Sequence, residues 1–147
     1  MTKWFRATQG ADQNVVADRD SSLALANFGD AHTAAASASF PIWQLYFWPG
    51  LPTPKLVSDL ETSDYRYLVV DNRMAHNVPV IGVYFVPNEP QAAQRTSPVP
   101  VAALSKYESL PWVTRIYTSN NLEIYRFDFA DYAAHPAVAS TILGSQP

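Results

Sequence analysis

Two short β-rich runs that each end in an aspartate constrain the fold of this chain more than any other feature. They are residues 14–17, which Asp18 follows, and residues 66–70, which Asp71 follows. Apolar and β-branched runs of this length are typical of buried strands. Parallel pairing of the two runs places both aspartates at the carboxyl edge of one sheet, which is the edge where open α/β sheets bind ligands.

Capping and turn residues divide much of the remaining chain into short elements. We expect helices over residues 2–9, after Asp20, from Pro54 onward and over residues 100–110. Asp20 is expected to cap the second of these helices, and Asp18 to end the preceding strand. A further strand is expected over residues 32–36.

The C-terminal part has the pattern of a β-hairpin. Residues 113–118 and 122–129 are two alternating runs around Ser119-Asn120-Asn121, and asparagine tolerates the positive φ of tight turns. Residues 72–100 hold five prolines and are expected to be mostly irregular. The element order predicts an α/β or α+β fold, with a three-layer-like sheet, short helices and this C-terminal hairpin.

Length and composition favour one domain and exclude several classes of function. We place the domain at residues 1–130 and a tail at residues 131–147. The net charge of −3 gives no basic stripe, so a nucleic-acid partner is not expected. No apolar run is long enough to span a bilayer, and no signal-peptide pattern opens the chain. The absence of cysteine excludes disulfides and thiolate metal sites.

No motif identifies an enzyme. The sequence has no P-loop, no G-x-G-x-x-G and no G-x-S-x-G pattern. His32, His76 and His135 are isolated from one another and lack the spacing of metal ligands. We therefore predict no catalytic residue, no metal site and no cofactor.

The acidic and basic residues at the predicted strand ends are the first candidate site. Arg19 and Arg73 closely follow Asp18 and Asp71, so the four side chains are suited to hold an anionic ligand or a glycan. The alternative is a structural aspartate–arginine network around loop backbone. A third interpretation takes Asp18 and Asp20 as a D-x-D motif that holds a divalent cation together with Asp71, although helix capping is the better explanation of that triplet.

A dense aromatic segment is the second candidate. It contains Phe40, Trp43, Tyr46, Phe47 and Trp48. The cluster is suited to stacking against sugar rings, to a membrane interface, or to packing in the core. Trp43 and Trp48 join the predicted ligand-binding residues if their side chains are exposed.

Several short motifs occur in an order that resembles a known family. They are Trp4-Phe5-Arg6, Asn14-Val15-Val16-Ala17-Asp18-Arg19, Leu25-Ala26-Asn27-Phe28-Gly29, Tyr67-Leu68-Val69-Val70-Asp71-Asn72-Arg73, Pro79-Val80-Ile81-Gly82-Val83-Tyr84-Phe85, Glu89-Pro90, Leu104-Ser105-Lys106-Tyr107 and Arg115-Ile116-Tyr117 through Ile124-Tyr125. This order resembles the C-terminal soluble region of actinobacterial multi-pass membrane proteins, which are themselves similar to glycosyltransferases that use lipid-phosphate sugars. The resemblance runs from about residue 4 to residue 129. The chain departs from it at Asn72, where the family often has arginine, and at the 119–121 turn, where glycine is common.

The resemblance implies an extracytoplasmic domain that belongs to a larger membrane protein. The catalytic carboxylates of the resembled family lie near its membrane helices, so no catalytic residue carries over to this chain. The implied partners are the protein's own transmembrane region, the membrane surface and cell-envelope glycan.

We therefore expect a non-catalytic accessory domain that binds acceptor glycan or covers a membrane active site. Its candidate ligand-binding residues are Asp18, Arg19, Asp71, Arg73, Trp43 and Trp48. The alternatives are a stand-alone protein-interaction module, with the aromatic segment as its contact face, and a small carboxylate- or metal-dependent α/β enzyme.

Overall fold

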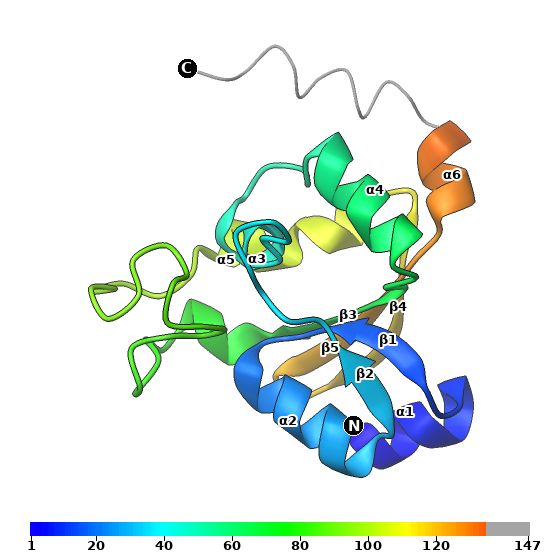
Figure 1. Cartoon of the computed structure of the whole chain (residues 1–147), viewed down its shortest axis with the longest axis horizontal. Coiled ribbons are helices and arrows are strands. Elements are labelled where there is room, and N and C mark those ends of the chain that lie inside the picture. The colour runs from blue at the N-terminus through cyan, green and yellow to red at the C-terminus, as the bar shows by residue number, and fades with distance from the viewer. Residues whose placement is uncertain (135–147) are drawn as a thin grey trace.

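The chain folds around a mixed five-stranded sheet with short helices on both faces, which confirms the expected α/β or α+β class (Figure 1). The computed structural model describes residues 1–134. Within this range the strands are β1 (Gln13–Val16), β2 (Ala31–Thr33), β3 (Tyr67–Asp71), β4 (Val113–Ser119) and β5 (Leu122–Phe127). The helices of the same residues are α1 (Thr2–Gln9), α2 (Arg19–Phe28), α3 (Gln44–Phe47), α4 (Pro54–Thr62), α5 (Val101–Ser105) and α6 (Phe129–Ala134), with 3₁₀ helices η1 (Asn72–Ala75) and η2 (Lys106–Ser109).

The strand order is β2-β1-β3-β5-β4. β1 lies parallel to β2 on one side and to β3 on the other, and Val16 pairs with Leu68 in the second ladder. The parallel pairing of the two apolar runs is therefore confirmed. The predicted hairpin is also present, since β5 pairs antiparallel with β4 and Asn120 in its turn has a φ of 50°.

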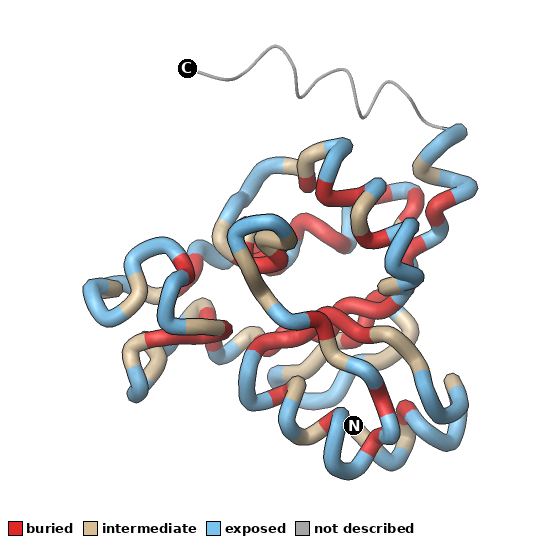
Figure 2. Tube along the Cα trace, in the orientation of Figure 1, coloured by how far each residue is buried: buried red, intermediate tan, exposed pale blue. Residues whose placement is uncertain are grey.

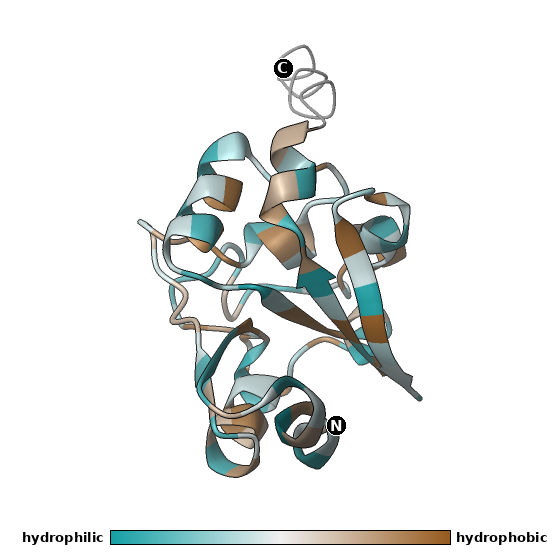
Figure 3. Ribbon diagram, turned by 90° about the vertical axis from the view of Figure 1, so that its right-hand side faces the viewer, coloured by the Kyte–Doolittle hydropathy of each residue, from teal (hydrophilic) through white to brown (hydrophobic). Residues whose placement is uncertain are grey.

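Side-chain alternation along the strands creates two cores, one on each face of the sheet. Val15 and Val69 face a cluster that includes residues of α1 and α2, whereas Val16 and Val70 face the larger cluster under α3, α4, α5 and α6. All five residues of β3 are buried, and a view turned by 90° shows the two helical layers on opposite sides of the sheet (Figures 2 and 3). The strongly apolar runs at β1 and β3 follow from this arrangement, because both faces of these strands are covered.

Two local boundaries differ from the expected ones. Asp18, rather than Asp20, is the N-cap of α2, because its Oδ1 accepts hydrogen bonds from the backbone N–H groups of Asp20 and Ser21 at 3.0 and 3.1 Å. The strand expected over residues 32–36 ends at Thr33. The start of α4 agrees with the sequence, since Thr53 caps the helix and Pro54 occupies its first turn.

The folded part continues beyond residue 130, where the sequence had placed the start of a tail. Helix α6 crosses that boundary, and the ring of Tyr132 packs against Trp112 with their centroids 4.9 Å apart. His135 and the remainder of the expected tail, residues 135–147, lie outside the described residues.

Residues 76–100 connect η1 to α5 without helix or strand, as the prolines suggested. The connection is nevertheless tied to the domain. The carboxylate of Glu89, only 3% exposed, accepts hydrogen bonds from the backbone N–H groups of Tyr84 and Phe85 at 3.0 and 2.7 Å. Tyr84 in turn accepts a backbone hydrogen bond from Arg19 at the start of α2. This loop therefore lies against the carboxyl end of β1.

Across residues 1–134, no helix has both the length and the apolar character needed to cross a membrane.

Candidate functional site

The carboxyl ends of β1 and β3 meet at the point where the chain reverses its direction across the sheet. From β1 the chain passes through α2 to β2 on one side, and from β2 it passes through α3 and α4 to β3 on the other side of β1. Because α2 and α4 cover opposite faces of the sheet (Figure 1), the connections diverge at this edge. In open α/β sheets such a topological switch point is the usual place for a ligand crevice.

A pocket of about 330 Å³ lies at this edge, and we call it the switch-point pocket. Its polar lining includes Asp18, Arg19, Asp20, Asp71, Arg73 and Asn77, and its apolar lining includes Met74, Val78, Val80, Ile81, Val83 and Tyr84. Small-molecule pockets have volumes of roughly 300–1,000 Å³, so this one is at the small end of that range. The structure thus brings four of the six candidate residues to one pocket, although ligand binding there remains a prediction.

Asp18 is the most constrained side chain of the pocket. The residue is only 6% exposed, and its Oδ1 is occupied by the two backbone amides that it caps. Its Oδ2 is buried and has no hydrogen-bond partner. Burial raises the pKa of the Asp18 carboxyl above its ordinary value, and the negative charge of Asp71 contributes to the rise, while the hydrogen bonds from Ser21 and Asp20 oppose it. A buried acceptor without a donor is costly, and it makes Asp18 the strongest indication of a ligand at this site.

Asp71 and Arg73 form a closed pair at the other side of the pocket. The backbone N–H and Nε of Arg73 both donate to Asp71 Oδ1 at 2.9 Å, and one terminal nitrogen reaches Oδ2 at 2.5 Å. The hydrogen bonds with Asp71 raise the pKa of Arg73 above its ordinary value. This geometry realises the structural aspartate–arginine network foreseen as an alternative, and Asp71 balances the charge of Arg73.

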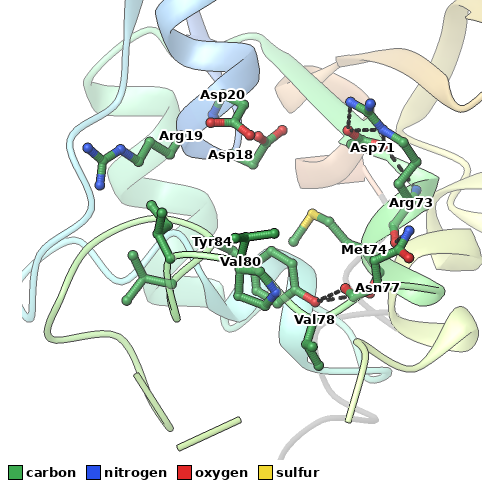
Figure 4. Close-up of a pocket in the computed structure, with 13 residues that line it drawn as sticks. Asp18, Arg19, Asp20, Asp71, Arg73, Met74, Asn77, Val78, Val80 and Tyr84 are labelled. Carbon is green, nitrogen blue, oxygen red and sulfur yellow. Dashed lines mark hydrogen bonds and ion pairs between the residues drawn. The ribbon is translucent and has the colours of Figure 1, made fainter. Parts of the chain in front are cut away.

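Arg19 does not complete an anion clamp with Arg73. Figure 4 shows its side chain extending away from the Asp71–Arg73 pair, whereas Asp18 and Asp20 lie between them. In the described part of the chain, neither the Arg19 guanidinium nor the Asp20 carboxylate has a hydrogen-bond or ion-pair partner. The centre of the pocket is consequently acidic rather than basic, which argues against an anionic ligand held between the two arginines.

The apolar side of the pocket was not anticipated from the sequence. Val78, Val80 and Ile81 are 42%, 103% and 62% exposed, and they surround the pocket from the loop that precedes Gly82. Tyr84 closes the inner side and donates its hydroxyl hydrogen bond to the carbonyl of Asn77 at 2.6 Å. An aliphatic run within a proline-rich, irregular segment is the signal that points to these residues, because such a run has no strand or helix to bury it.

The aromatic segment lies mainly in the core. Trp43 is 9% exposed and Tyr46 is fully buried, with its hydroxyl donating to the carbonyl of Val69 at 2.8 Å. Trp48 is 45% exposed, and neither tryptophan lines the switch-point pocket. The core-packing interpretation therefore describes most of this segment, and a continuous aromatic contact face is not formed.

A metal centre finds no support in the geometry. Among residues 1–134, no group of three or more His, Asp or Glu side chains is arranged to hold a metal ion. Asp18 and Asp71 use their carboxylates for backbone and guanidinium hydrogen bonds instead. The metal-dependent enzyme is consequently the least supported of the three functional interpretations.

No protein-family model matches the chain, and its sequence has no significant match among curated proteins. The resemblance to the soluble region of actinobacterial membrane proteins therefore remains a prediction from its short motifs.

Proposed function

We propose that this chain is a non-catalytic, extracytoplasmic accessory domain of a multi-pass membrane protein and that its switch-point pocket binds acceptor glycan. The observation that carries the binding proposal is the buried, unpartnered Oδ2 of Asp18 at a pocket of about 330 Å³. The extracytoplasmic and accessory parts of the proposal rest on the family resemblance.

The chemistry of the pocket suits a polyhydroxylated ligand. Sugar hydroxyl groups donate hydrogen bonds, and carboxylates such as those of Asp18 and Asp20 are the strongest acceptors that a protein offers. The C–H face of a sugar ring is apolar, and the exposed side chains of Val78, Val80 and Ile81 offer a complementary surface. A small pocket with carboxylate acceptors and an apolar rim therefore supports recognition of one or two sugar units.

The test is an NMR titration of the full chain with neutral arabinan and galactan oligomers. We expect the backbone amide signals of Asp18, Asp71 and Tyr84 to shift together and to saturate. The D18N variant keeps the helix cap, because asparagine caps as well as aspartate, but it replaces the free acceptor with a donor. We expect this variant to lose most of the response.

Asp12→Asn is the matched control, because it removes one carboxylate at the opposite edge of the sheet. Asp12 directly precedes β1, is exposed, and has a φ of 60° that asparagine tolerates. Its titration should match that of the unmodified chain. An absence of shifts at the pocket in millimolar glycan would overturn the glycan-binding proposal.

A second candidate function is contact with a membrane surface through the loop at residues 78–81. The fully exposed Val80 and the largely exposed Ile81 favour it, because neighbouring exposed aliphatic side chains form an apolar patch of the kind that marks interaction sites. Co-sedimentation with vesicles of phosphatidylglycerol and phosphatidylcholine tests this function. Binding that the V80S/I81S double variant abolishes would support it, and binding that the double variant retains would contradict it.

A further inference from the structure

The charges at the switch-point pocket are not balanced within the protein. Three carboxylates line it, from Asp18, Asp20 and Asp71. Of the two guanidinium groups, that of Arg73 is committed to Asp71, and that of Arg19 extends away from the centre (Figure 4). The carboxylates of Asp18 and Asp20 are therefore left without a cation of their own among residues 1–134.

We infer that the switch-point pocket prefers sugars that carry a primary ammonium group over neutral sugars, with the ammonium placed at Asp18. This inference rests on the proposed glycan-binding function and names the class of sugar. The ammonium supplies the donor that Asp18 Oδ2 lacks and the positive charge that the neighbouring carboxylates lack.

Geometry and electrostatics favour an ammonium over a hydroxyl group at this position. A hydroxyl group offers one donor and no charge, whereas an ammonium offers three donors and a full positive charge. Charge-assisted hydrogen bonds are also about twice as strong as neutral ones. The ammonium would additionally relieve the repulsion between Asp18 and Asp71, whose mutual influence is seen in the raised pKa of Asp18.

The walls of the pocket strengthen this preference. Asp18 is 6% exposed, and the aliphatic side chains of Val78, Val80 and Ile81 surround the opening. The burial of Asp18 lowers the effective dielectric constant around its carboxylate, so an ion pair formed there is stronger than one in water. The same walls favour a sugar ring next to the ammonium over a freely hydrated small cation.

The experiment compares glucosamine, glucose and N-acetylglucosamine in NMR titrations of the full chain, at a pH at which the amine is protonated. Glucose lacks the nitrogen, and N-acetylglucosamine keeps the ring and the nitrogen but not the charge. We expect glucosamine to bind about tenfold more tightly than the other two, a difference typical of one charge-assisted hydrogen bond. Shifts should cluster at Asp18, Asp71 and Tyr84.

Three variants assign the preference to its residues. D18N should reduce the affinity for glucosamine at least to the affinity of the unmodified chain for glucose, and D20N should reduce it only a few-fold because Asp20 is exposed. D12N, at the opposite edge of the sheet, should have no effect. Equal affinities for glucosamine in D18N and in the unmodified chain would overturn the inference.

The remaining outcomes separate this inference from the proposed function. Equal binding of glucose and glucosamine at the pocket would overturn the ammonium preference and leave glycan binding in place. An absence of pocket shifts with every sugar would overturn both. Binding of Nα-acetyl-lysine amide as tightly as glucosamine would overturn the sugar part of the inference, because that compound carries the side-chain ammonium without a ring.

Discussion

Lys106 is a buried cation whose replacement should stabilise the protein and remove part of the pH dependence of its free energy of unfolding. It begins η2, is only 8% exposed, and donates from Nζ to the carbonyl of Trp48 at 2.5 Å. No carboxylate pairs with it within residues 1–134. Burial lowers the pKa of Lys106 from its ordinary value of 10.5 to about 7.

The size of the effect follows from the two pKa values. Each pKa unit corresponds to 1.36 kcal/mol, so the difference between 10.5 and about 7 sets an upper limit of about 5 kcal/mol on the cost of burying the charged amine. Between these pKa values the unfolded chain holds a proton that the folded protein has released. The free energy of unfolding therefore rises with pH over this window, by at most about 1.4 kcal/mol per pH unit, and it is flat below pH 7.

The variant K106M keeps most of the side-chain volume and removes the charge. It also leaves the Trp48 carbonyl without its donor, which costs about 1–3 kcal/mol. We expect the variant to be about 1–3 kcal/mol more stable than the unmodified chain at pH 7. The unmodified chain should gain about 3 kcal/mol from pH 7 to pH 9.5, and K106M should lack this gain.

Urea denaturation followed by tryptophan fluorescence at pH 6, 7, 8, 9 and 9.5 measures both effects. The series stops at 9.5 because burial raises the pKa of Tyr46 and Tyr107, so their ionisation in the unfolded chain lowers stability at higher pH. K3M, at an exposed lysine, is the control and should follow the unmodified chain. A pH dependence that is the same in K106M and in the unmodified chain would refute the reasoning.

Three further substitutions test the surroundings of the pocket, each by chemical denaturation. D18A removes the cap of α2 and should lower the free energy of unfolding by about 1 kcal/mol. D18N should be at least as stable as the unmodified chain, because its side chain still caps the helix and no longer buries an unpaired charge. Equal losses of stability in both variants would contradict the capping role. E89A should lower the free energy of unfolding by about 2–4 kcal/mol, since it leaves the buried backbone amides of Tyr84 and Phe85 without an acceptor, and E89Q should lower it less. Hydrogen exchange at these two amides provides a second measurement. G82A should lower the free energy of unfolding by about 1–2 kcal/mol, because Gly82 has a φ of 80° that alanine rarely adopts. G50A, at an open position with negative φ, should leave stability unchanged. Similar losses of stability at both glycines would count against backbone strain.

Local interactions explain why much of the secondary structure could be predicted. The Thr53 cap with Pro54 in the first turn of α4, and Asn120 in the hairpin turn, act through atoms only a few residues apart. The same reasoning misplaced the cap of α2, because Asp18 and Asp20 are both good capping residues. The choice between them depends on where β1 ends, which the sheet determines.

The position of Asp18 next to Asp71 has a mixed origin. Their places at the ends of apolar runs were readable from the sequence, and the parallel pairing of β1 and β3 brings them to one edge. The direction of the Arg19 side chain and the ion pair between Asp71 and Arg73 could not be predicted from the sequence, because side-chain direction depends on neighbours that are distant along the chain. An anion clamp was consequently plausible from the sequence, whereas the geometry is that of an acidic pocket.

The sequence by itself determined the short apolar strands, the cap of α4, the hairpin turn and the alternation that makes a two-faced sheet, because hydrophobic periodicity and capping act locally. Only the tertiary structure decided which charged groups are buried without an opposite charge beside them. Nothing in the sequence around Lys106 or Asp18 indicates that its charge is buried, and the pKa of each group is shifted by the packing of segments far away along the chain. Desolvation is a property of the assembled environment, and so the chemistry of this pocket emerges only when the loop at residues 76–100 lies against the end of β1.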